Sequence, residues 1–272
     1  MKQKNGVRVK IYFYGAIFFM LSKTLLGKFD TFIFDLDGTF WWYTKVVEGG
    51  EKIYKKLQDL SKKVIFVSNF TLLDRDEIVK VLRKNGILAT KEQIITSSLV
   101  ASKLLKGKSV FPIGKGLEDE LRKNGVKIAK NEKANIVVVG HDINFDYKKA
   151  SIALNILLRK NSEFYTTAYG RLWILNDKTV PGTGLIVSGL EYCSKRRAIL
   201  LGKPSKFMLE EVKKASEGKA IYFGDEIKAD IEFANKAGFY SVFVKEGIDK
   251  KISRKSKPKA ILNSLKDLLK FL

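Results

Sequence analysis

The chain has 272 residues, 45% of them hydrophobic, and a formal net charge of +22 at neutral pH. This length allows one large or two modest domains, and no repeat or low-complexity tract is present. A single cysteine, Cys193, excludes an intrachain disulfide, and a single histidine, His141, excludes a His-based triad or a His-rich metal site. Because the lysines are spread along the chain, we interpret the charge as a dispersed, solvated surface rather than a nucleic-acid surface.

The first 28 residues precede the first predicted strand of the core. Residues 1–10 are polar and basic, and Ile11–Leu21 is a largely apolar run that is too short to cross a bilayer. Three interpretations remain open. Residues 1–19 lie upstream of a true start at Met20, or form a short N-terminal extension, or act as a signal or anchor. We expect no membrane partner.

A pair of carboxylates follows the first predicted strand. Thr31–Phe34 is a mostly apolar run of strand length, and Asp35, Asp37 and the turn residue Gly38 come next. Side chains two apart on an extended chain point the same way, so both carboxylates should meet one spot past the strand's end. Two such charges ~4 Å apart repel by roughly 4 kcal/mol at an effective dielectric of ~20. A divalent cation would remove that cost.

Strands and helices alternate along the rest of the chain, which indicates an α/β fold with a parallel sheet. Strands are predicted at residues 63–67, 94–95, 110–113, 135–139, 163–167, 172–175, 198–201, 219–223 and 240–244. Helices are predicted at residues 51–60, 75–85, 98–105, 117–123, 147–159, 184–192, 205–215, 230–236 and 261–271. The aromatic stretch Phe40–Tyr43 forms either a flap beside the site or a hairpin packed on the core. The Gly-rich loop Pro181–Gly184 either positions a substrate loop or simply closes a connection.

Polar side chains follow three more predicted strands. Ser68-Asn69 follows the second strand, Lys203 stands between Gly and Pro after residues 198–201, and Asp225 and Asp230 follow residues 219–223. Ligands of parallel α/β sheets bind outside the carboxyl ends of the strands, so these groups are candidates for one site.

In this order, the four strand ends resemble the four motifs of the haloacid-dehalogenase-like (HAD) phosphohydrolases. A narrower resemblance, from residue 29 to the end, is to the NagD-like branch, which includes p-nitrophenyl, phosphoglycolate and pyridoxal phosphate phosphatases. The segments that carry it are V-S-N at 67–69, I-T-S-S at 95–98, V-V-V-G-H-D at 137–142, P-G-T-G at 181–184 and G-K-P at 202–204. The resemblance implies a Rossmann-like HAD core at residues 29–106 and 197–272, an inserted α/β cap domain at 107–196, and an N-terminal extension at 1–28.

The resemblance also implies a role for each strand-end residue. Asp35 would be the nucleophile that forms an aspartyl-phosphate, and Asp37 would be the general acid and base. Mg²⁺ would be held by Asp35, the Asp37 carbonyl and Asp225, with Asp230 in support. The phosphate would be bound by Ser68, Asn69 and Lys203.

The sequence departs from the family pattern at several positions. Phe70 replaces a second Asn after the motif-two serine, and motif four carries Glu226 and Ala229 where Arg and Thr are usual. The segment at 166–171 should face the leaving group, with Tyr169 and Arg171 as candidate specificity residues. Arg171 either recognises a second anionic group or is ordinary surface charge.

The predicted function is a cytoplasmic, Mg²⁺-dependent phosphatase of a small phosphorylated metabolite. The resemblance allows a homodimer through the cap. We expect no nucleic-acid partner, because the lysines are dispersed and the acidic set is intact. Two alternatives remain. The chain is a basic nucleic-acid-binding protein that kept the fold without turnover, or it is a phosphotransferase.

Overall fold

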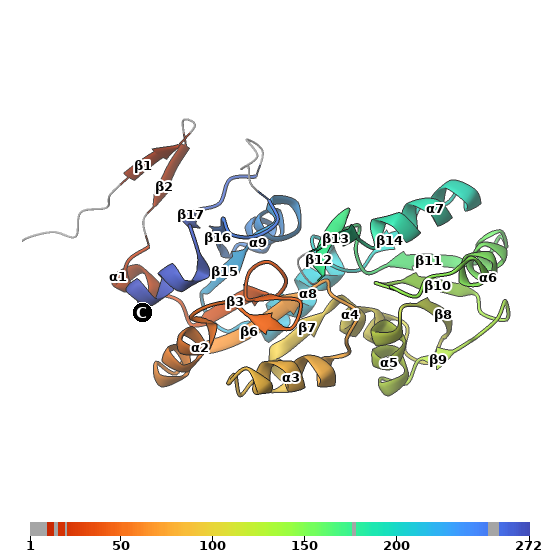
Figure 1. The fold of residues 1–272 in the computed structure, drawn as a ribbon, viewed down its shortest axis with the longest axis horizontal. Coiled ribbons are helices and arrows are strands. Elements are labelled where there is room, and N and C mark those ends of the chain that lie inside the picture. Colours follow the sequence, from red (N-terminus) through yellow and green to blue (C-terminus); the bar gives the residue numbers. More distant parts are fainter. Residues whose placement is uncertain (1–9, 14–15, 20, 176–177, 250–255) are drawn as a thin grey trace, which may run out of the picture.

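The computed structural model describes residues 10–13, 16–19, 21–175, 178–249 and 256–272. Two parallel β-sheets, each flanked by helices, lie side by side along the long axis of the molecule (Figure 1). The predicted α/β class is therefore confirmed.

The first sheet has six strands in the order β17-β16-β15-β3-β6-β7, and every neighbouring pair is parallel. The bounds are β3 Thr31–Asp35, β6 Lys63–Ser68, β7 Ile94–Thr96, β15 Ala220–Gly224, β16 Tyr240–Val244 and β17 Ala260–Leu262. Strands covered on both faces read as continuous apolar runs, which is why β3 and β15 were easy to predict.

Helices cover both faces of this sheet. The apolar faces of α2 (Gly50–Asp59) and α3 (Arg75–Lys84) pack with Phe32 and Phe34 of β3 on one side. On the other side, Ile33 packs in a second cluster with the buried side chains of three helices. These are α4 Ser97–Leu104, α8 Lys206–Ala215 and α9 Glu232–Ala237.

The second sheet has five strands in the order β14-β11-β10-β8-β9, again all parallel. The bounds are β8 Ser109–Ile113, β9 Lys127–Ile128, β10 Ile136–Val139, β11 Glu163–Thr166 and β14 Ile199–Leu200. Its helices are α5 Lys115–Lys123, α6 Tyr147–Leu157 and α7 Gly184–Ser194. β14 lies past residue 196, the expected end of the inserted unit.

Beyond residue 40, two short antiparallel hairpins lie outside the sheets, β4 Trp41–Trp42 with β5 Lys45–Val46, and β12 Leu172–Leu175 with β13 Lys178–Pro181. Phe40 and Trp41 are fully buried, so the aromatic stretch packs on the core rather than forming a free flap.

The prediction of a terminal helix at residues 261–271 is wrong. Ala260–Leu262 instead pairs with β16 as strand β17, and a short 3₁₀ helix, η3, covers Leu265–Lys270. Ser264 and Asp267 form a capping box that begins η3. The leucine spacing alone fits an amphipathic helix as well as it fits the observed strand and 3₁₀ helix. Residues 260–262 form a strand because β16 has an open edge with which they pair. Two other short helices are η1 (Lys91–Gln93) and a π-helical turn, η2 (Ile227–Ile231).

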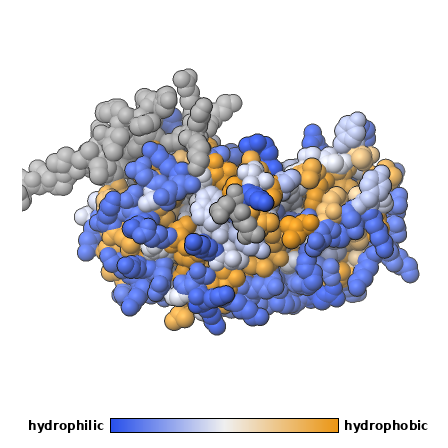
Figure 2. Space-filling model, viewed as in Figure 1, coloured by the Kyte–Doolittle hydropathy of each residue, from blue (hydrophilic) through white to orange (hydrophobic). Residues whose placement is uncertain are grey.

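Near the N-terminus, β1 (Lys10–Phe13) pairs with β2 (Ala16–Phe19), and α1 (Lys23–Leu26) follows. Residues 1–9, 14–15 and 20 are outside the described residues, and the three interpretations of residues 1–19 fall largely on them. In the described part of the chain, no helix has the length and hydropathy that a membrane span needs. Hydrophilic residues are spread over both halves of the face shown in Figure 2.

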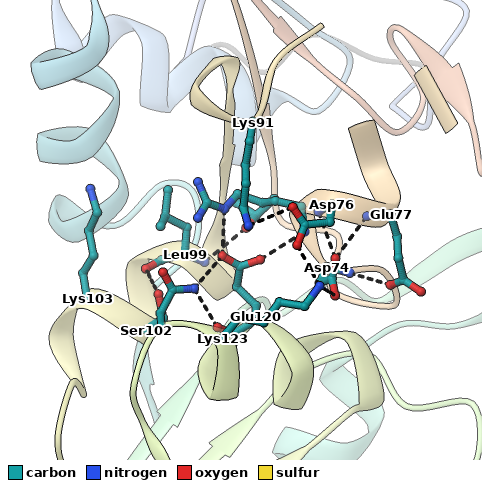
Figure 3. A network of polar contacts seen from close by, with 12 residues as sticks. Asp74, Asp76, Glu77, Lys91, Leu99, Ser102, Lys103, Glu120 and Lys123 are labelled. Atoms are coloured by element: carbon teal, nitrogen blue, oxygen red, sulfur yellow. Dashed lines mark hydrogen bonds and ion pairs between the residues drawn. The ribbon is translucent and has the colours of Figure 1, made fainter. Parts of the chain in front are cut away.

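A network of ion pairs and hydrogen bonds joins the two sheets through α3 and α5 (Figure 3). The Glu120 carboxylate on α5 is fully buried and accepts hydrogen bonds from Arg75 Nε at 2.7 Å and from the Arg75 backbone N–H at 3.0 Å. Lys123 Nζ lies 2.7 Å from a carboxylate oxygen of Asp74, which is the N-cap of α3. It also lies 2.7 Å from a carboxylate oxygen of Asp76. Specific contacts therefore set the position of the second sheet against the first.

Replacing Glu120 by Ala should lower the free energy of unfolding by about 3 kcal/mol, because it leaves the mostly buried Arg75 charge without its partner. Glu118→Ala on the same helix is the matched control. It breaks only an exposed i,i+4 pair with Arg122 and should cost less than about 1 kcal/mol. Urea unfolding measures both, and equal losses for the two variants would contradict this account of the network.

Candidate active site

Asp35 is the last residue of β3, and Asp37 follows in the turn at the carboxyl end of the first sheet. Gly38 makes this turn with φ +84°, and a Cβ there would lie 2.4 Å from Asp225 Oδ2. Only glycine allows the two acidic segments to approach this closely. The first and fourth predicted strand ends therefore meet at one place.

Lys203 lies at the centre of the acidic cluster and is only 4% exposed. Its Nζ donates to Asp35 Oδ1, to Asp230 Oδ1 at 2.6 Å and to the Tyr222 hydroxyl at 3.0 Å. Burial lowers the pKa of Lys203, but the attraction of Asp230 and Asp35 outweighs this effect and holds that pKa well above its usual range. The ammonium is therefore charged at all physiological pH values.

The Asn69 side chain holds the backbone of Lys203. Its Oδ1 accepts from the Lys203 N–H at 2.7 Å, and its Nδ2 donates to the Lys203 carbonyl at 3.1 Å. One N–H of the Asn69 amide is used in this way, and its second Nδ2–H remains available for another acceptor. The structure therefore shows Asn69 positioning the lysine, a function that the sequence did not suggest.

Asp230 and Asp225 differ in how many of their acceptor sites are used. Asp230 accepts from Lys203 and Tyr222 at Oδ1, and from the N–H groups of Asp225 and Glu226 at Oδ2. Within the described residues, Asp225 accepts from the Thr39 hydroxyl, at 3.0 Å, and from the Ile248 N–H, at 2.6 Å. Asp225 has the greater capacity left for another ligand.

The cluster carries more negative charge than Lys203 neutralises. One carboxylate oxygen each from Asp35, Asp225 and Asp230 lies within 4.8 Å of the other two, and all three residues are buried. Burial and mutual repulsion raise the pKa values of Asp35 and Asp225 well above their usual range. Hard oxygen donors with uncompensated charge suit a divalent cation such as Mg²⁺, so the donor set fits the predicted metal.

Asp37 is in a different environment from Asp35. Its Oδ1 accepts from Trp41 Nε1 at 2.9 Å, and its Oδ2 accepts from the Ser68 hydroxyl at 3.4 Å. Burial raises the pKa of Asp37 to about 7, despite these hydrogen bonds. A carboxyl that gains and loses its proton near neutral pH is suited to general acid–base catalysis.

A cavity of about 250 Å³ opens in front of these carboxylates and is lined by both halves of the molecule. The lining residues from the first half include Asp35, Asp37, Ser68, Asn69 and Phe70. Those from the second half include His141 and residues 168–173. The rings of Phe70, His141 and Trp173 pack against one another, with centroids 5.6–6.0 Å apart. This aromatic group forms one wall of the cavity.

The predicted site residues converge on this cavity. Asp35, Asp37, Ser68, Asn69, Lys203, Tyr169 and Arg171 line it, and Asp225 and Asp230 lie behind Asp35 and Lys203.

Some residues of the site were not identified from the sequence. Tyr222 reads as part of an apolar strand, and no local signal marks its hydroxyl as a partner of Lys203. His141 gave no functional signal either, yet it lines the cavity, and burial lowers its pKa to about 4, so the imidazole is neutral at pH 7. Glu226 also lines the cavity, and burial raises its pKa to about 7.

The raised pKa of Asp37 predicts a pH-dependent effect on the stability of the metal-free protein. A carboxyl whose pKa rises from 3.8 to about 7 on folding stabilises the fold fully below pH 3.8, and this contribution is lost as the pH rises through 7. The loss is at most about 4 kcal/mol. Asp37→Asn removes the titration and keeps the size and shape of the side chain.

In EDTA, the melting temperature of Asp37→Asn should therefore exceed that of the wild type at pH 8 by more than it does at pH 5. Asp59→Asn, an exposed acid on α2, is the control and should show no such trend. The same difference between Asp37→Asn and wild type at both pH values would show that Asp37 does not titrate in this range.

Comparison with known proteins agrees with this geometry. Residues 32–127 match the haloacid dehalogenase-like hydrolase family, and residues 200–268 match a second HAD-type hydrolase profile. A 4-nitrophenylphosphatase of Schizosaccharomyces pombe is 31% identical over 260 residues, which cover 84% of this chain and 87% of that protein. Chronophin of Mus musculus is 27% identical, with 83% and 84% covered.

Among solved structures, a p-nitrophenyl phosphatase from Archaeoglobus fulgidus superposes with a TM-score of 0.80 at 27% identity. The match covers 90% of this chain and all of that one. The sequence relatives and the shared fold agree with the strand-end geometry. The chain belongs to the haloacid-dehalogenase-like hydrolases, in the NagD-like branch that contains the p-nitrophenyl phosphatases.

Proposed function

We propose that this phosphatase hydrolyses small phosphomonoesters in a Mg²⁺-dependent reaction through an aspartyl-phosphate intermediate. The observation that carries the proposal is the contrast between two carboxylates at the end of one strand. Asp35 contacts the Lys203 ammonium in a cluster with excess negative charge, and the pKa of Asp37 is about 7. One is suited to attack, and the other to move a proton.

Asp35 is the proposed nucleophile. Lys203 occupies its Oδ1, and no hydrogen bond to Oδ2 is found within the described residues. A bond from this carboxylate to phosphorus forms as the bond from phosphorus to the leaving oxygen breaks, and the Asp37 carboxyl supplies the proton that the leaving oxygen needs. Asp37, now ionised, then takes a proton from a water molecule that attacks phosphorus, and phosphate and free Asp35 result.

The metal is proposed to be held by Asp35, the Asp37 carbonyl and Asp225, which has acceptor capacity left. Asp230 supports it from behind, because its two oxygens already accept four hydrogen bonds. When bound, Mg²⁺ would offset negative charge on the carboxylates and the phosphoryl oxygens.

Ser68, Asn69 and Lys203 are proposed to bind the phosphoryl group. The Ser68 hydroxyl already receives the Phe70 N–H at 2.9 Å and faces Asp37, so its position is well defined. Lys203 supplies the only ammonium inside the acidic cluster of the described chain, and a dianionic phosphate needs such a partner.

The second sheet and its helices are proposed to act as a cap domain on a core. The bounds expected from the sequence are 107–196 for the cap and 29–106 and 197–272 for the core, but β14 (Ile199–Leu200) also belongs to the second sheet. The cavity lining supports this division, because residues 168–173 face the catalytic carboxylates from the second half of the molecule. Three further statements stay predictions. They are that residues 1–28 form an extension, that two caps pair in a homodimer, and that the protein is cytoplasmic.

The substrate is proposed to be a small phosphorylated metabolite whose leaving group meets Tyr169 and Arg171. Arg171 is exposed, lines the cavity and forms no ion pair with any described residue. An unpaired guanidinium at this place suits a second anionic group on the substrate.

Asp35→Asn should reduce phosphate release from p-nitrophenyl phosphate at least about 10³-fold, because the amide is a poor nucleophile. The melting temperature should not fall, since the change removes a repelling charge from the cluster. Asp59→Asn is the control and should keep full activity. Wild-type activity in a folded Asp35→Asn protein would refute the assigned role.

A further inference from the structure

The segment from Ala168 to Arg171 forms the cap-side wall of the cavity, between β11 and β12. It is irregular chain, and yet it must present Arg171 in a defined place if that residue is to select substrates. The contacts that hold this wall segment therefore bear on specificity.

The loop Pro181–Gly184 holds the wall segment by its backbone. Gly182 N–H donates to the Arg171 carbonyl at 3.0 Å, and Gly184 N–H donates to the Gly170 carbonyl at 2.9 Å. A Cβ on Gly182 would lie 2.3 Å from that Gly170 oxygen. Of the two interpretations of this Gly-rich loop, the contacts favour the positioning of a substrate loop.

The wall segment is also held by a side chain, that of Tyr169. The Tyr169 hydroxyl lies 2.6 Å from Glu191 Oε1 and 3.0 Å from the Ala198 carbonyl, and it donates to one of them at a time. Burial raises the pKa of Tyr169 well above its usual range, so the hydroxyl keeps its proton. The acceptor Glu191 is on α7 and is only 8% exposed.

The Glu191 carboxylate also accepts hydrogen bonds from residues other than Tyr169. It accepts the Ala198 N–H at 2.9 Å and Arg197 Nη1 at 2.8 Å. Burial raises the pKa of Glu191, but these donors outweigh it and the net shift is downward, so the carboxylate is charged and its hydrogen bonds are charge-assisted. Ala198 leads directly into β14, and Leu200 at the end of β14 lines the cavity. One buried carboxylate therefore joins the wall segment to the chain that leads to Lys203.

We propose that Glu191, through its hydrogen bond to Tyr169, is a positioning residue for leaving-group selection: it holds the wall segment so that Arg171 faces the leaving group. This inference rests on the proposed function. Glu191 does not line the cavity, and its effect on the reaction passes through Tyr169 and Arg171.

The test compares kcat/KM for phosphoglycolate, whose leaving group carries a carboxylate, with kcat/KM for p-nitrophenyl phosphate, whose leaving group lacks one. Glu191→Gln should lower the ratio about three- to tenfold, mainly through KM for phosphoglycolate, with kcat for p-nitrophenyl phosphate unchanged. Tyr169→Phe removes the same hydrogen bond from its other end and should lower the ratio by a similar factor. Matched controls are Tyr192→Phe on α7 and Glu210→Gln on α8, both at exposed side chains, which should leave the ratio as in the wild type.

A double-mutant cycle separates positioning from a general effect on stability. Arg171→Ala should lower the same ratio about tenfold, and adding Tyr169→Phe should lower it no further, because the tyrosine acts through Arg171. Full additivity, or an equal loss of kcat on both substrates, overturns the inference while the proposed function stands. If wild-type protein releases phosphate from neither substrate nor any other phosphomonoester, the proposed function fails and this inference fails with it.

Discussion

The contact of the Lys203 ammonium with Asp35, Asp230 and Tyr222 is the interaction on which the rest of the site depends. A buried charge is tolerated only where partners surround it, and here the partners come from two neighbouring strands of the first sheet and from the turn after one of them. The lysine neutralises only part of the acidic cluster. The remaining negative charge suits a divalent cation.

The position of this lysine is set by both halves of the molecule. Lys203 follows β14, an edge strand of the second sheet, and its backbone is clamped by Asn69 from the end of β6. The buried Arg75–Glu120 network sets how α5 rests on α3. The cavity therefore lies between two units whose relative position is defined by specific contacts. The carboxylates of the first half face residues 168–173 of the second half across it.

Much of the site could be predicted because its residues follow apolar strands. Asp35 and Asp225 are easy to find for this reason, and their places at the ends of β3 and β15 follow from the rule for parallel sheets. Tyr222 and Glu191 could not be found, because their partners Lys203 and Tyr169 lie 19 and 22 residues away in the sequence and no local pattern marks either residue. The wrong terminal helix has the same cause, since Ala260–Leu262 becomes a strand only where β16 offers an open edge.

The most direct measurement is phosphate release by the wild-type protein from a panel of phosphomonoesters, including p-nitrophenyl phosphate, with Mg²⁺ and with excess EDTA. The account predicts release with Mg²⁺, loss of release in EDTA and its recovery when Mg²⁺ is restored. No release from any member of the panel, by protein shown to be folded and to bind Mg²⁺, would contradict it.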